Sequence, residues 1–194
     1  MPEDPKSEER PKRGETRKRR TRDQILRTAT KLFYEEGVGA VGVDRVAAEA
    51  GVSKRTLYNH FPSKDALLLA YLTGQDRPRE PGEDPVAAIL AVFERMEGRI
   101  AHAGFRGCPF VMAAAELADP AHPASRLAQD FKRRSRSWLA ERLAAAGVAD
   151  PESLSEEIAI LMDGTLAQAS VLGDPAVARA ARRAALTGIE AARR

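Results

Sequence analysis

Apolar residues recur along most of the chain at the spacing of one helical face. A first amphipathic helix is predicted from positions i, i+4, i+7 and i+8, which are Ile25, Ala29, Leu32 and Phe33. This helix is expected to end at Gly37. Alternation typical of strands is nearly absent, and the chain is rich in alanine, which favours helix. The pattern therefore predicts an all-α protein.

Three short helices are predicted to follow. Gly51 ends the first, because glycine most readily takes the left-handed conformation that closes a helix. Ser53 and Ser63 supply the side-chain oxygens that cap the second and third helices. The apolar positions of these helices are, in chain order, Val43, Val46, Ala47 and Ala50, then Leu57 and Phe61, and then Ala66, Leu67, Ala70 and Tyr71.

Five further helices are predicted for the rest of the chain. Their approximate ranges are 85–101, 109–117, 123–146, 154–172 and 175–192. Residues 73–84 precede them and are rich in proline and glycine, which interrupt helices. We therefore expect a linker over 73–84.

Composition excludes several classes of protein. The chain has 194 residues, of which 43% are hydrophobic and 30% charged, as in ordinary folded domains. Its longest apolar run, 86–93, is far shorter than the ~20 residues that span a membrane. No apolar segment of a secretory signal follows the basic N-terminal stretch. A single cysteine, Cys108, excludes an internal disulfide framework and the CxxC pairs of zinc modules. We expect a cytoplasmic protein with no membrane partner.

The net charge of +3 is mild, but its distribution along the chain is uneven. Between Arg10 and Arg22 there are eight basic residues and one acidic residue, Glu15. This stretch has no valine, isoleucine, leucine or aromatic residue with which to bury a face, so residues 1–20 are predicted to be a disordered basic arm. Such an arm suits phosphate binding, because each neutralised phosphate releases a counterion. A solvated tail is the alternative.

Residues 43–61 (VDRVAAEAGVSKRTLYNHF) have the pattern helix, glycine-containing turn, helix. This pattern is typical of the helix-turn-helix, whose second helix enters the major groove of DNA. Val52 fills the angle between the helices, and Ser53 begins a helix whose free N–H groups and dipole favour a phosphate. With Leu57 and Phe61 facing inward, the polar side chains left to face outward are Lys54, Arg55, Thr56, Tyr58, Asn59 and His60.

The stretch 21–72 resembles the N-terminal domain of the TetR family of bacterial transcriptional regulators. The string GVSKRTLYNHFPSKDALL carries the resemblance most specifically, because its turn, its recognition helix and the start of the fourth helix occur together at the family's spacing. The resemblance implies a three-helix DNA-binding head bundled with the start of a fourth helix. It also implies an all-α C-terminal body that binds a small molecule and dimerises.

The resemblance also implies roles for individual residues, by matching position. The implied phosphate contacts are Thr56, Tyr58 and Lys64, the implied base readers are Lys54, Arg55 and Asn59, and His60 packs near or touches the DNA backbone. Gly42 departs from the family, which usually has threonine or serine there; glycine still caps a helix but brings no hydroxyl to a phosphate. The full predicted DNA-binding set is Thr21, Arg22, Ser53, Lys54, Arg55, Thr56, Tyr58, Asn59, His60 and Lys64.

In the C-terminal part, aromatic, methionine and cysteine side chains predict a cavity between helices that accepts a small apolar ligand. Packing in an ordinary core is the alternative for each of them. The segment FRGCPFVMAAAELADPAHPASR resembles the start of the sixth helix in a subset of the family. The predicted ligand-binding residues are Phe93, Met96, Phe105, Cys108, Phe110, Met112, Phe131, Trp138 and Met162.

Cys108 has three interpretations: an inert buried thiol, a redox or electrophile sensor, or a nucleophile paired with His102 or His122. No strand–turn–helix setting for a nucleophile is present, so we predict no catalytic residue. Glu116, Asp119 and His122 lie close enough in sequence to ligate a metal, but Pro120 and the short spacing favour a helix cap with surface charges. If Glu116 is buried, it needs a partner, for which the candidates are Arg126, Arg133 or a polar group of the ligand. We predict no metal and no cofactor.

The last two predicted helices are rich in small residues, and in the TetR family these helices form the dimer interface. Ala180, Ala181, Ala184 and Ala185 give the final helix a smooth face for close helix approach. A two-fold operator also requires a two-fold protein. We therefore expect a homodimer, with packing inside one chain as the alternative.

Together these observations predict a homodimeric repressor that a small apolar effector, or modification of Cys108, releases from a palindromic operator on double-stranded DNA. The expected organisation is a basic arm over 1–20, a helix-turn-helix domain over 21–72, a linker over 73–84 and a ligand-binding and dimerisation domain over 85–194. Two other classes compete with this prediction. One is an enzyme or carrier with a vestigial head, and the other is a nucleoid protein without sequence preference.

Overall fold

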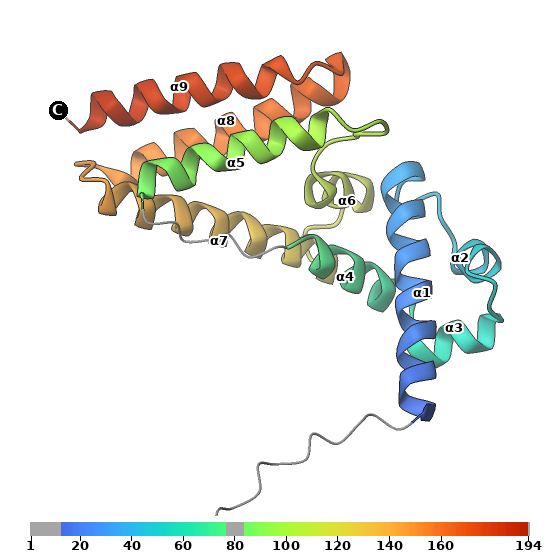
Figure 1. The fold of residues 1–194 in the computed structure, drawn as a ribbon. Coiled ribbons are helices and arrows are strands. Elements are labelled where there is room, and N and C mark those ends of the chain that lie inside the picture. Colours follow the sequence, from blue (N-terminus) through green and yellow to red (C-terminus); the bar gives the residue numbers. More distant parts are fainter. Residues whose placement is uncertain (1–12, 77–83, 194) are drawn as a thin grey trace, which may run out of the picture.

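The computed structural model describes residues 13–76 and 84–193, and within these ranges every regular element is a helix (Figure 1). The all-α prediction is confirmed. The helices are α1 (Arg13–Glu36), α2 (Val43–Glu49), α3 (Lys54–His60), α4 (Lys64–Gln75), α5 (Pro85–Ile100), α6 (Pro109–Leu117), α7 (Pro123–Ala145), α8 (Pro151–Leu172) and α9 (Ala176–Ala192). In the described part of the chain no helix is both long and apolar enough to cross a membrane.

Helices α1 to α4 form a head whose packing follows the predicted apolar pattern. The four predicted apolar residues of α1 are each at most 2% exposed. The predicted caps are present, since the Thr56 N–H donates to Ser53 Oγ and the Ala66 N–H donates to Ser63 Oγ, both over 3.0 Å. Gly51 takes the left-handed conformation, with φ at +63°. These interactions set the turns between α2 and α3 and between α3 and α4.

The long helices α5, α7, α8 and α9 form the body. α7 packs against α8, and α9 packs against both α5 and α8 (Figure 1). Their shared core includes Ile89, Phe93, Leu139 and Ile189, each at most 1% exposed. The short helix α6 lies between this bundle and the head (Figure 1).

The head does not close its core with its own helices. Phe110 and Ala113 of α6, and Ala124 and Ala128 of α7, belong to the same buried cluster as the apolar face of α1. Phe110 and Ala113 are 2% and 0% exposed. The core of the head is therefore completed by α6 and the start of α7, while the long helices of the body bury a second cluster of their own.

The observed helices differ from the predicted ones mainly at their ends. α1 begins at Arg13, so residues 13–20 are helical rather than disordered, while residues 1–12 lie outside the described range. Extending an existing helix costs much less than starting one, and arginine and lysine favour helix. α4 continues to Gln75, into the predicted linker, of which residues 77–83 are outside the described range. α8 begins at Pro151, because Asp150 accepts a hydrogen bond from the Ser153 N–H.

Gly37 is a position where only glycine fits without strain. It follows α1 with φ at +98°, and a Cβ built there would lie 2.7 Å from Glu116 Oε2. We expect Gly37→Ala to lower the free energy of unfolding by more than about 1 kcal/mol. Gly98→Ala is the matched control, because Gly98 lies in α5 with no atom within 4 Å of such a Cβ. It should raise the free energy of unfolding by about 0.5–1 kcal/mol. Urea unfolding checks both signs, and changes of equal sign would contradict the account.

Candidate nucleic-acid interface and ligand cavity

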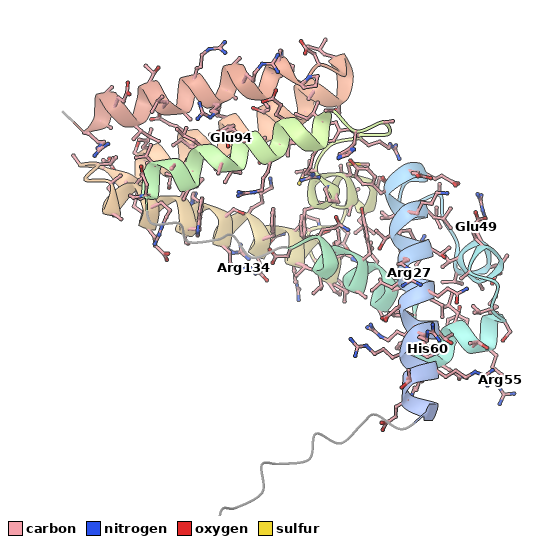
Figure 2. The ribbon with its side chains drawn as sticks, viewed as in Figure 1. Arg27, Glu49, Arg55, His60, Glu94 and Arg134 are labelled. Carbon is pink, nitrogen blue, oxygen red and sulfur yellow. The ribbon has the colours of Figure 1, made fainter. Side chains whose placement is uncertain are left out.

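The turn between α2 and α3 holds α3 at the outer edge of the head. Leu57 and Phe61 are at most 2% exposed and anchor α3 on the head's core. The opposite side of α3 is solvent-facing: Lys54, Arg55 and Asn59 are exposed, and Tyr58 is 41% exposed. Arg55 extends away from the body (Figure 2). The structure thus presents the outward donors of the predicted helix-turn-helix on one accessible surface.

Several predicted contact residues already have partners within the head. Ser53 Oγ and Thr56 Oγ1 lie 2.8 Å apart, so the two hydroxyls support each other at the start of α3. Lys54 Nζ lies 2.8 Å from Asp44 Oδ1, and hydrogen bonding to this carboxylate raises the pKa of Lys54. Lys54 is therefore charged at neutral pH, but Asp44 competes with any phosphate or base for its ammonium group.

The remaining predicted contacts lie around the ends of α3. His60 and Lys64 are partly buried at the end of α3 and the start of α4. The Thr21 hydroxyl donates to the Arg17 carbonyl over 3.2 Å, which makes Thr21 part of α1. The Arg22 guanidinium lies 4.8 Å from the centre of the Phe61 ring, in a cation–π contact that joins α1 to the end of α3.

The first turns of the described part of α1 form a strongly basic helix. Residues 15–20 are all exposed, and α1 extends past α3 at this end (Figure 1). Among the described residues, none of the cations from Arg17 to Arg20 has an ion-pair partner. A helix that is polar on all sides gains nothing from packing. Its positive charge therefore remains available to an external polyanion.

A cavity of about 410 Å³ lies in the body between α5, α7, α8 and the start of α6. Five predicted ligand-binding residues line it, namely Met96, Cys108, Phe110, Phe131 and Met162. The rings of Phe110 and Phe131 stack there, with centres 3.9 Å apart. Since Phe110 also belongs to the head's core, one wall of the cavity is shared with the head.

The other four predicted ligand-binding residues do not line this cavity. Phe93 is 1% exposed inside the body's core, and Trp138 packs against the same core. Phe105 lines a separate cleft beside α1, and Met112 lies next to Gly107. Helical spacing places apolar residues on a face, but it does not distinguish a face that meets a cavity from one that meets another helix.

Charged side chains also border the cavity, and the predicted ligand-binding set included none of them. Most of them are paired: Lys132 with Asp163, Arg136 with Glu156 at 3.5 Å, and Arg133 with Asp130 at 2.6 Å. The cavity therefore combines an apolar floor with a charged border.

The possible metal cluster around Glu116 is a set of helix-end interactions instead. The Ala124 N–H donates to His122 Nδ1 over 3.1 Å, and His122 Nε2 lies 3.4 Å from Asp65 of α4. Asp119 accepts from the Ala121 N–H over 2.8 Å. Nowhere in 13–76 or 84–193 do three or more histidine, cysteine, aspartate or glutamate side chains form a group that could hold a metal.

Known proteins resemble the chain along most of its length. Residues 25–71 match the family described as bacterial regulatory proteins, tetR family, and residues 85–184 match the LmrA/YxaF-like transcriptional regulator C-terminal domain. The chain belongs to the TetR family of bacterial transcriptional regulators. The resemblance stated from the sequence is thus confirmed, and the family consists of DNA-binding regulators rather than enzymes.

Individual relatives agree with this assignment. A TetR-family regulator from Streptomyces coelicolor, SCO4454, is 34% identical and superposes with a TM-score of 0.84, covering 90% of this chain and 96% of that one. The regulator YjdC of Escherichia coli is 26% identical over 76% of this chain and 82% of its own length. The match to TcmR of Streptomyces glaucescens is 34% identical but spans only 42% of this chain and 39% of that protein.

In this TetR-family chain, a set of hydrogen bonds that the sequence did not predict ties the end of α1 to the body. We call Tyr34, Glu35, Gly39, Arg106 and Glu116 the α1 clamp. Arg106 Nη1 donates to the carbonyls of Tyr34 and Glu35, over 3.0 and 2.6 Å. The Arg106 N–H donates to Tyr34 Oη over 2.9 Å, and the Gly39 N–H donates to Glu116 Oε2 over 2.8 Å.

Part of the α1 clamp pairs the backbone carbonyls at the C-terminal end of α1. The last carbonyls of α1 lack partners within the helix, and a guanidinium there also complements the negative end of the helix dipole. Glu116 is exposed rather than buried, and its observed partner is a backbone N–H rather than Arg126 or Arg133. The α1 clamp thus joins the loop before α6, and α6 itself, directly to the head.

The Lys54–Asp44 pair yields a test of the DNA-facing surface. Asp44→Asn removes the carboxylate that competes for Lys54, so we expect tighter binding to DNA of any sequence. The slope of log affinity against log salt should steepen by about 0.9, the value for one more neutralised phosphate. Glu49→Gln is the control, because Glu49 lies at the other end of α2 and pairs with Arg45 at 3.8 Å. Fluorescence anisotropy at several salt concentrations measures both. An equal steepening for Glu49→Gln would contradict a specific role for Lys54.

Proposed function

We propose that this TetR-family regulator is a homodimeric repressor that binds a palindromic operator and leaves it when an effector occupies the α5–α8 cavity. The observation that carries the proposal is Phe110, which lines the cavity and completes the core of the DNA-binding head. A ligand that shifts Phe110 must change the packing of α1 and α4. The effector would then favour a head arrangement that no longer matches the operator, which is a shift between two populated states.

The surface of α8 supports a dimer. Val171, Ile160 and Leu172 are 83%, 67% and 60% exposed, which leaves large apolar side chains without cover in one chain. On α9 the predicted smooth face divides: Ala181 and Ala185 pack inward, while Ala180 and Ala184 are exposed. An exposed apolar patch of this kind is typical of a protein–protein interface. A second copy would also provide the second head that a palindrome needs.

On DNA, α3 is proposed to enter the major groove while α1 approaches neighbouring phosphates. Thr56, Tyr58 and Lys64 are proposed to hold phosphates, and Lys54, Arg55 and Asn59 to read bases. The unpaired cations of α1 support additional phosphate contacts through Arg22 and the turns before it. Half-sites should lie about one or two helical turns apart, at about 10 base pairs each.

Modification of Cys108 is a second proposed cause of release from the operator. Its thiol is partly exposed and lines the same cavity, so a reagent that enters the cavity meets it. Adding a group there would occupy the space proposed for the effector. A Cys108→Ala variant separates the two routes, because it should lose release by thiol reagents and keep release by a non-covalent effector.

Selection of binding sites from random duplexes, at a stated salt concentration, tests the proposed function. We expect a palindrome to be enriched, which would also provide the probe for an effector screen by release. Binding that depends on salt but enriches no sequence would overturn the operator proposal and favour a nucleoid role.

Four single variants separate phosphate contacts from base contacts on the recovered operator. We expect Tyr58→Phe and Lys64→Ala to weaken binding to all sequences, and Lys64→Ala to reduce the salt slope by about 1. Arg55→Ala and Asn59→Ala should cost about 1–3 kcal/mol on the operator and relax its sequence preference. Competition binding against single-base operator variants measures both effects. If all four leave operator affinity unchanged, α3 is not the recognition helix.

We predict that the α1 clamp is needed for release from the operator by an effector and contributes little to operator affinity. Arg106→Ala removes the hydrogen bonds to the Tyr34 and Glu35 carbonyls without touching α3. We expect operator affinity to change by less than about threefold, while the concentration of a releasing compound needed for half release shifts at least fivefold, the lower end of usual allosteric coupling. Arg126→Ala, an exposed arginine outside the clamp, is the control. Unchanged release in Arg106→Ala would show that the clamp does not transmit the signal.

A further inference from the structure

One cation on the border of the cavity has no counterion in the part of the chain that the structure describes. Arg99 of α5 lines the cavity, and among the described residues it has no ion-pair or hydrogen-bond partner. The other basic side chains of the lining are held by Asp163, Asp130 and Glu156. Within 13–76 and 84–193, the cavity border thus has one positive charge that no acidic side chain neutralises.

Arg99 also stands where the cavity meets a second space. A cleft of about 300 Å³ lies between α1 and the loop over 102–105, and Gln75 and Arg99 line both the cleft and the cavity. Lys31 and His102 line the cleft too, against a single acidic residue, Glu35. Arg99 therefore borders both the cavity and a cleft whose lining carries more basic than acidic side chains.

The floor of the cavity suits an apolar chain or ring. Met96, Met162 and Leu166 line it beside the stacked rings of Phe110 and Phe131. Methionine side chains adapt to ligands of different shape. A volume of about 410 Å³ falls in the range of small-molecule sites.

From this arrangement we infer that the effector is an amphipathic anion whose apolar part fills the cavity and whose carboxylate is bound by Arg99 beside Gln75. This inference rests on the effector response proposed above and replaces the small apolar effector expected from the sequence. A guanidinium binds a carboxylate through two parallel hydrogen bonds, and such charge-assisted bonds are stronger than neutral ones.

A carboxylate bound by Arg99 would lie beside α1 of the head. The cleft is lined by Thr30, Lys31, Tyr34 and Glu35 of α1, and Tyr34 and Glu35 belong to the α1 clamp. A negative charge at Arg99 would attract Lys31 and draw α1 toward α5. A neutral ligand of the same shape would fill the cavity without this pull.

Isothermal titration calorimetry of the full chain without DNA tests the ligand class, with decanoate and its uncharged analogue decanamide as probes. We expect decanoate to bind at least about tenfold more tightly, because hydrogen bonds to charged groups are stronger by about this factor. Arg99→Ala should abolish the difference, and Arg99→Lys should retain part of it. Arg95→Ala is the matched control, since Arg95 is an exposed arginine one turn earlier on α5 that lines neither space.

Equal affinities for the two probes, no binding of either, or a difference that survives in Arg99→Ala would each overturn the inference. The test is independent of the operator, so its failure leaves the proposed repressor function to be judged by site selection. If decanoate binds through Arg99 but does not release the operator, the ligand class stands and the effector role of this cavity is wrong.

Discussion

The packing of α6 into the head is the constraint on which the rest of the structure depends. The four helices of the head leave their core open on one side, and Phe110, Ala113, Ala124 and Ala128 close it. Because protein interiors are densely packed, a change at Phe110 cannot remain local. The same ring forms a wall of the cavity in the body, so the head and the body of this TetR-family regulator are joined by shared apolar contacts.

Hydrogen bonds and one histidine–aspartate pair also connect the body to the head. The α1 clamp attaches the loop before α6 to the exposed carbonyls of α1, and His122 joins the start of α7 to Asp65 on α4. The body therefore contacts the head at both α1 and α4. Surface interactions of this kind contribute little to stability individually. Their importance lies in where they act, at the ends of the helices that position α3.

Local features of the fold could be predicted from the sequence, and long-range ones could not. Gly51, Ser53 and Ser63 act within a few residues, so their turns and caps follow from residue type and spacing. The partners in the α1 clamp lie 71 to 77 residues apart, and nothing in a single sequence pairs Arg106 with Tyr34. The same limit explains the cavity: Met96 and Phe93 lie three positions apart on α5, yet only Met96 faces the open space.

Thermal unfolding of a fragment comprising residues 1–84 tests most directly whether the core of the head depends on α6 and α7. The account predicts that this fragment, which lacks α6 and α7, shows no cooperative transition by circular dichroism, or one far below that of the full chain. The full chain should unfold with its head and body together. A fragment that unfolds cooperatively near the temperature of the full chain would contradict the claim, because the head would then be complete without Phe110 and its neighbours.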